Sequence, residues 1–247
     1  MADGADQLAP RRSREDDDGN ANGSLSPAAL QKLLAWLSPA FPVGAYTYSH
    51  GLEWAVEDGT VTGAATLEAW LTAILRHGAG RNDAILFSAA YHADGDALRA
   101  VADLGAAFQP SKERHLETTA QGRAFLSAVI ASWPNPRLAA AERVLAGAAL
   151  PYPVAVAVAA AAHDVPLVPA LTATLAAFVA NVVSAGVRAI PIGQTDGQRT
   201  IAALGPVIAM VAASADGATL DDLGGAALRA DIASMRHETQ YTRLFRS

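Results

Sequence analysis

The amino-acid sequence predicts an all-α fold: a single-domain bundle of about ten helices with no substantial sheet. Apolar residues recur at helical spacing in one segment after another. Hydrophobic residues make up 51% of the 247 positions and charged residues only 17%, which is enough apolar material for one large core. No stretch gives a convincing strand signal, and no repeat of fixed period divides the chain.

The first predicted helix begins at Pro27, with Ser26 as its N-cap. Its leucines fall on one face: Leu30, Leu33, Leu34 and Leu37. Pro39 ends it, because the residue before a proline is pushed out of the α region. After a loop at Phe41–Gly44, we expect a short helix over Tyr46–Glu57, stopped by Asp58 and Gly59.

Helical patterns then follow without a long interruption. They cover residues 66–78, 81–95, 96–108, 111–133, 136–149, 168–187, 198–213 and 220–235. Residues 151–165 carry a competing signal, because Val154, Val156 and Val158 alternate with alanine as in a strand. Five alanines among residues 157–162 favour a helix there.

Both ends of the chain differ from the predicted helical domain, residues 26–235. Residues 1–25 are acidic, with almost no apolar side chain to bury, and we expect them to be disordered. They lack the apolar segment of a secretory signal. Residues 236–247 combine aromatic, leucine and arginine side chains, the types that anchor interfaces, and we interpret them as a partner-docking tail. The alternative is a last helix folded back on the protein's own core.

Composition and motifs exclude several functional classes. The chain has no cysteine, so disulfides, thiolate zinc sites and cysteine nucleophiles are impossible; this also fits a cytoplasmic protein. A net charge of −6 gives no basic footprint for nucleic acid. The six histidines form no zinc motif, and neither a phosphate-binding loop nor a serine-hydrolase elbow is present.

Two alternatives stay open. One is a small-molecule enzyme, with the aromatic loop as pocket wall and Glu53, Asp83 or His50 as acid–base groups. The other is a membrane-associated bundle, because residues 165–187 carry no charge. That segment contains two prolines and Asn181, and a buried central helix explains it better, so we expect no membrane contact.

Several motifs resemble the UreF family of urease accessory proteins, and they follow the family's order. The long ones are residues 38–59 ("SPAFPVGAYTYSHGLEWAVEDG"), 181–199 ("NVVSAGVRAIPIGQTDGQR") and 234–247 ("SMRHETQYTRLFRS"). Shorter ones are "RND" at 81–83, "RAFL" at 123–126 and "YPVAVA" at 152–157.

The resemblance implies an all-helical homodimer that is not an enzyme. It implies binding to UreD/UreH, recruitment of the GTPase UreG, and delivery of nickel to apo-urease. It implies no tightly bound cofactor, with nickel handled in transit by the complex.

The residue types and the resemblance together predict three partner-binding patches. The first, in the aromatic loop, is an exposed recognition and lining surface rather than core: Phe41, Gly44, Tyr46, Tyr48, His50 and Glu53. The second, a polar turn for dimer or UreG contact, is Gln194, Thr195, Asp196 and Arg199. The third, for UreD/UreH, is Arg236, His237, Glu238, Tyr241, Arg243, Leu244, Phe245 and Arg246. Gly44 and Gly51 are expected to permit close backbone approach, and Tyr241, Leu244 and Phe245 to share a helix face.

Overall fold

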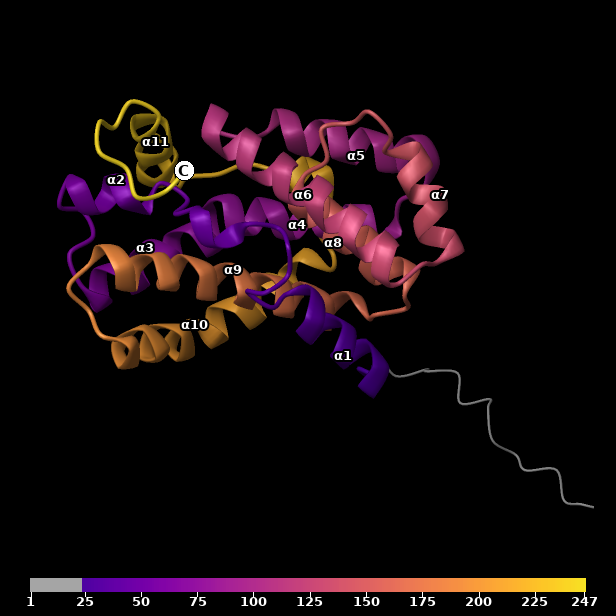
Figure 1. Cartoon of the computed structure of the whole chain (residues 1–247), viewed down its shortest axis with the longest axis horizontal. Coiled ribbons are helices and arrows are strands. Elements are labelled where there is room, and N and C mark those ends of the chain that lie inside the picture. The colour runs from indigo at the N-terminus through magenta and orange to yellow at the C-terminus, as the bar shows by residue number, and fades with distance from the viewer. Residues whose placement is uncertain (1–23) are drawn as a thin grey trace, which may run out of the picture.

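Helix α8 (Tyr152–Ala162) lies at the centre of the molecule (Figure 1). Nine of its eleven residues are buried, from Pro153 to Ala162. The alternating valines do not make a strand, because alanine favours the helix and lets α4 and α6 pack close to it. The predicted helix is therefore confirmed, buried on all sides.

The computed structural model describes residues 24–247, so nearly all of the predicted acidic leader lies outside the described residues. The other α-helices, in chain order, are α1 (Pro27–Trp36), α2 (Leu52–Glu57), α3 (Ala64–His77), α4 (Ala79–His92), α5 (Gly95–Ala107), α6 (Lys112–Ser132), α7 (Pro136–Val144), α9 (Leu167–Ala189), α10 (Gln194–Ala215) and α11 (Leu228–His237). Two short 3₁₀ helices are η1 (Ala45–Thr47) and η2 (Leu220–Asp222). Within residues 24–247 no strand occurs, which confirms the all-α prediction.

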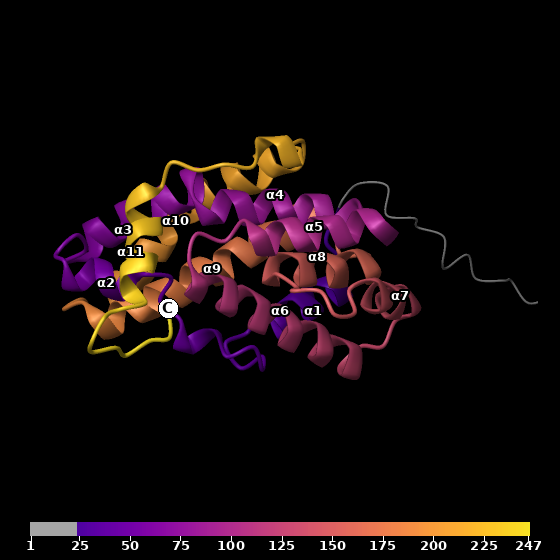
Figure 2. The same ribbon diagram turned by 90° about the horizontal axis from the view of Figure 1, so that it is seen from above.

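The remaining long helices pack around α8. Helices α4, α6 and α9 contact it, and α10 packs along α9 and against α3 (Figures 1 and 2). The stripe predicted on α3 is buried as expected: Leu67, Trp70, Leu71, Ile74 and Leu75. Helix α11 and the last residues of the chain lie over α2 at one end of the molecule, in yellow in Figure 1.

Helix α1 has its predicted N-cap, but only part of its predicted leucine face is buried. Ser26 accepts the N–H of Ala29, as a capping serine does. Leu33 is buried as expected, whereas Leu30 and Leu34 are 45% and 67% exposed. The helix packs through Trp36, whose ring meets Phe125 edge to face, and the buried face therefore runs through Ala29, Leu33 and Trp36.

Three other element predictions were wrong in their bounds. The helix expected over Tyr46–Glu57 is divided, because His50 and Gly51 both have positive φ between η1 and α2. The polar stretch 193–199 is mostly the first turn of α10 rather than a turn between helices. The last helix begins at Leu228 instead of Leu220.

Helices α9 and α10 are long and apolar enough, by length and composition alone, to cross a membrane. They are not fully buried as predicted, because residues of α10 such as Ala202, Ala209 and Met210 are exposed. Their opposite faces pack into the core through Leu171, Val179 and Leu204. A core helix of a soluble protein passes the same test, so this finding is weak support for a membrane location.

Candidate functional site

Two of the predicted patches, far apart in sequence, lie against each other. The backbone N–H of Arg246 donates to the carbonyl of Thr47 at 2.8 Å. The N–H of Ser49 donates to the carbonyl of Ser247 at 2.7 Å. The aromatic loop and the last residues of the chain therefore form one surface, which we call the loop–tail surface and define as residues 44–53 and 236–247.

Glycine shapes this surface in two ways. Gly51 has φ +76°, and a Cβ there would lie 2.8 Å from the backbone nitrogen of Ser234 in α11. The predicted close approach therefore occurs at Gly51. Gly44 also has a left-handed φ, +71°, but no atom lies within 4 Å of its Cβ position. At Gly44 the backbone conformation, not close approach, requires glycine.

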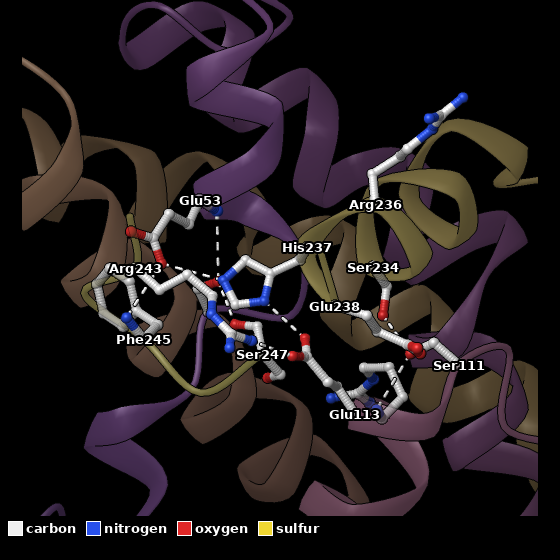
Figure 3. Close-up of polar contacts among 12 residues, drawn as sticks. Glu53, Ser111, Glu113, Ser234, Arg236, His237, Glu238, Arg243, Phe245 and Ser247 are labelled. Atoms are coloured by element: carbon white, nitrogen blue, oxygen red, sulfur yellow. Dashed lines mark hydrogen bonds and ion pairs between the residues drawn. The ribbon is translucent and has the colours of Figure 1, made fainter. Parts of the chain in front are cut away.

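A group of charged side chains, buried or half-buried except for Arg243, holds the tail down (Figure 3). Glu53 of α2 accepts the backbone N–H groups of Leu244 at 2.6 Å and Phe245 at 3.0 Å. Its carboxylate also lies 3.1 Å from Nε2 of His237, which is fully buried. On the other side of the ring, Nδ1 lies 2.6 Å from Glu113. Arg243 donates to the second oxygen of Glu113 at 2.7 Å.

Every charged side chain in this group has a partner. Both ring nitrogens of His237 face carboxylate oxygens, one of Glu53 and one of Glu113. Arg243 adds a guanidinium beside Glu113. Buried charges are tolerated when they are paired and hydrogen-bonded in this way. We call these four residues the tail clamp.

A second buried cluster anchors the final residue. Glu117 of α6 accepts from Arg114 at 2.7 Å, Ser247 at 2.6 Å and Gln121 at 3.2 Å. His50 Nε2 lies 2.9 Å from the same carboxylate, and His50 Nδ1 contacts Arg114. Burial alone would raise the pKa of Glu117, but Arg114, His50 and Ser247 outweigh it and bring the pKa to about 2. Burial, with Arg114, lowers the pKa of His50, so the ring is neutral at pH 7.

Arg188, at the end of α9, joins the two halves of the loop–tail surface. Its guanidinium lies 3.7 Å from the centroid of the Tyr46 ring and 4.5 Å from that of Phe245. It also donates to the carbonyl of Tyr46 at 3.0 Å. Arg188 therefore holds the Tyr46 ring of the aromatic loop next to the Phe245 ring of the tail.

The predicted surface residues divide into exposed and buried groups. Tyr241 is fully exposed, Leu244 is 72% exposed and Tyr46 is 60% exposed. Arg236, Arg243 and Arg246 are also exposed, and Glu238 is half-buried. The side chain of Arg236 points away from the tail clamp in Figure 3. The buried group comprises Tyr48, Glu53, His237 and Phe245. Phe41 is half-buried against Phe125, and His50 is half-buried.

The prediction that this entire loop is exposed was therefore wrong. Tyr48 and Glu53 are covered because the tail lies over the segment between them. The helix face expected for Tyr241, Leu244 and Phe245 is also absent, since α11 ends at His237. The tail cannot continue as a helix while its backbone N–H groups bond to Glu53 and Thr47.

The second predicted patch stays exposed at the start of α10. Gln194, Thr195 and Arg199 are exposed, and Asp196 pairs with Arg199 at 2.9 Å along the helix surface. Such an exposed pair adds little stability. Its polar side chains remain available to a partner.

Sequence reasoning missed four residues that organise the site: Glu113, Arg114, Glu117 and Arg188. A signal existed for three of them. The first half of α6, "KERHLETTAQG", has almost no apolar face, although the helix is long and contacts the core helix α8. A polar helix in that position has to bury polar groups against each other. No comparable signal marked Arg188.

The structure brings together two of the three groups named for the alternative enzyme hypothesis. His50 and Asp83 line one cavity, whereas both oxygens of Glu53 are occupied in the tail clamp. Asp83 lies within α4.

The amino-acid sequence is similar to that of one family of known proteins. A family model described as UreF matches residues 61–205. The chain is 55% identical to the urease accessory protein UreF of Rhodopseudomonas palustris strain BisB18 over 95% of this chain and 99% of that protein. It is 57% identical to UreF of strain BisB5, over 89% and 92% of the two chains. It is 54% identical to UreF of Methylobacterium sp. strain 4-46, over 87% of each.

Proposed function

The chain belongs to the UreF family of urease accessory proteins, and we propose that it acts as a binding scaffold in urease maturation. In this proposal it is a cytoplasmic homodimer without catalysis of its own. It binds UreD/UreH and recruits the GTPase UreG, so that nickel reaches apo-urease. The names of the relatives support the accessory role. The features below support the proposed partners and the proposed handling of nickel.

The observation that carries the proposal is the form of the tail. Residues 236–247 are fixed to the body by buried charges, yet they present Tyr241 and Leu244 to solvent. Arg236, Arg243 and Arg246, in the same twelve residues, are exposed as well. Exposed aromatic, aliphatic and arginine side chains on a segment that is already fixed are typical of a protein-binding hot spot, because little entropy is lost on docking. We assign this surface to UreD/UreH.

The exposed first turn of α10 is the second proposed contact. Gln194, Thr195, Asp196 and Arg199 offer hydrogen-bond donors and acceptors without a large apolar anchor. Such a composition suits either the dimer contact or UreG. Whichever of these two partners does not bind here would bind another face of this chain.

Nickel is treated as cargo in this proposal. The part of the chain that the structure describes contains no group of three or more histidine, cysteine, aspartate or glutamate residues arranged to hold a metal ion. Both ring nitrogens of His50 and of His237 already face other side chains. Either histidine would have to give up a buried contact to ligate nickel, which favours transit through the complex over storage in this chain.

The test is co-expression with UreD/UreH, followed by size-exclusion chromatography with light scattering. We expect Tyr241→Ala/Leu244→Ala to lose the complex while remaining folded, and urease from such cells to contain less nickel. The matched control is Leu30→Ala/Leu34→Ala, which removes two exposed leucines from α1. Equal complex formation by both variants would exclude the tail as the docking surface. Turnover of a small molecule by the isolated protein would favour the enzyme alternative.

A further inference from the structure

A cavity of about 320 Å³ opens between the aromatic loop and α9. It reaches inward to α4, α6 and α8, so its floor lies near the centre of the fold. Exposed residues at its mouth are Pro39, Tyr46, Ala180 and Ser184. Most of the wall is apolar, including Trp36, Phe87 and Phe178. The volume of this cavity and its mostly apolar lining are those of a site that binds a small molecule.

The floor carries two polar side chains with unused hydrogen-bonding capacity. Arg114 is 4% exposed and lines the cavity; its Nη1 contacts His50 and Glu117, but Nε and Nη2 donate to no group among residues 24–247. Asp83, from α4, also lines the cavity and makes no hydrogen bond or ion pair within the same residues. Both side chains line the cavity, so these atoms are available to a molecule that occupies it.

The two groups demand opposite chemistry. Arg114 offers only donors, and an ionised Asp83 offers only acceptors. Burial raises the pKa of Asp83 to about 6, with Arg114 opposing the rise and Glu117 adding to it, so the carboxylate is largely ionised at pH 7.5. Glu117 does not compete for the ligand, because its oxygens already accept from Arg114, Gln121 and Ser247.

We propose that this cavity binds a free small molecule with a carboxamide head and an apolar body. The carbonyl oxygen accepts from Arg114, the amide N–H donates to Asp83, and the body lies along the apolar wall. A carboxylate head would be repelled by Asp83, and an amidinium head by Arg114. A neutral head with one acceptor and one donor satisfies both. The cavity shares Ala45, Tyr46 and His50 with the loop–tail surface, but its lining does not include Tyr241 and Leu244, the side chains that the proposed function uses.

Three isosteric probes test the head group: benzamide, benzoate and benzamidine, titrated at pH 7.5 with ligand-observed NMR. We expect benzamide to bind with a Kd on the order of 1 mM, as suits a ligand of its size. Benzoate and benzamidine should bind at least about tenfold more weakly. Absence of benzamide binding, or a tighter charged probe, would overturn the proposal.

Variants locate the binding. Asp83→Leu should weaken benzamide about tenfold, whereas Asp83→Asn should keep it and strengthen benzoate. Ala180→Trp, at the exposed mouth, should abolish binding without disturbing the core; Ala202→Trp, on the exposed face of α10, is its matched control. Binding that survives Ala180→Trp, or that is unchanged by Asp83→Leu, would overturn the assignment. Arg114 is left intact because it also holds Glu117.

Discussion

At the scale of single residues, the fold depends on carboxylates that are buried but fully occupied. Glu53 is 8% exposed, and its two oxygens accept two backbone N–H groups and face His237. An unpaired carboxylate at such a position would be strongly destabilising. The backbone N–H groups of Leu244 and Phe245 and the side chains of His237, Arg243 and Ser247 therefore meet carboxylates on α2 or α6, and this matching fixes the tail's conformation.

Replacing Glu53 tests this directly. Glu53→Gln substitutes an N–H₂ group for one oxygen, which then faces other donors, so we expect a loss of about 2 kcal/mol in the free energy of unfolding. Glu57→Gln, at an exposed position of the same helix, should change it by less than about 0.5 kcal/mol. Urea unfolding measures both. Equal stabilities would mean that Glu53 does not hold the tail.

Asp83 makes the free energy of unfolding depend on pH, and its raised pKa determines the direction of that dependence. Its pKa is about 6 in the folded chain, above its ordinary value near 4, so the folded state favours the protonated form. This carboxyl therefore destabilises the protein increasingly as the pH rises from about 4 to 6. The change in pKa corresponds to at most ~3 kcal/mol, and because Asp83 is half-buried at the cavity wall we expect about 1 kcal/mol.

Asp83→Asn should accordingly be more stable than the parent protein at pH 7.5 and equal to it near pH 4. Urea unfolding at both pH values measures the difference, with the exposed Asp221→Asn as control. Glu117 contributes in the opposite direction, because its lowered pKa stabilises the protein above about 4.5 and this stabilisation is lost as the pH falls toward 2. A stability difference that is the same at both pH values would contradict the assignment to Asp83.

At the scale of elements, periodicity predicted helices well where one face meets the core. In α3 every residue of the predicted stripe is buried. In α1 the leucines obeyed the same rule, but one large side chain, Trp36, decided which face turns inward. Periodicity carries no information on such a choice, which depends on the partner helix.

The break between η1 and α2 was equally hidden, because His50 has a positive φ that its residue type does not predict. Gly51→Ala should cost roughly 3 kcal/mol, since it adds backbone strain and a contact of 2.8 Å with α11. Gly44→Ala has the same kind of strain without a contact, so about 1 kcal/mol is expected. Thermal unfolding should rank the two. An equal effect would show that α11 can move away from α2.

At the scale of the whole molecule, the candidate site is a product of long-range contact. Leu244 and Glu53 are 191 positions apart, and Ser49 and Ser247 are 198 apart. The sequence marked both segments as unusual through their aromatic and arginine content. It could not show that they form one surface, because complementary hydrogen bonds between irregular segments leave no periodic pattern. Arg188 and the polar half of α6 complete the surface from two further elements.

Removing the last five residues distinguishes the tail's contribution to stability from its proposed binding of a partner. A chain ending at Thr242 loses the buried Phe245 and Ser247 and leaves Glu53, Glu113 and Glu117 without several donors. We therefore expect it to lose at least about 3 kcal/mol in the free energy of unfolding, with faster amide exchange in α2 and α11. Tyr241→Ala/Leu244→Ala touches only exposed side chains and should leave stability and exchange unchanged while removing the partner. If the shortened chain is as stable as the parent, the tail is an appendage and its packing onto Glu53 is dispensable for the fold.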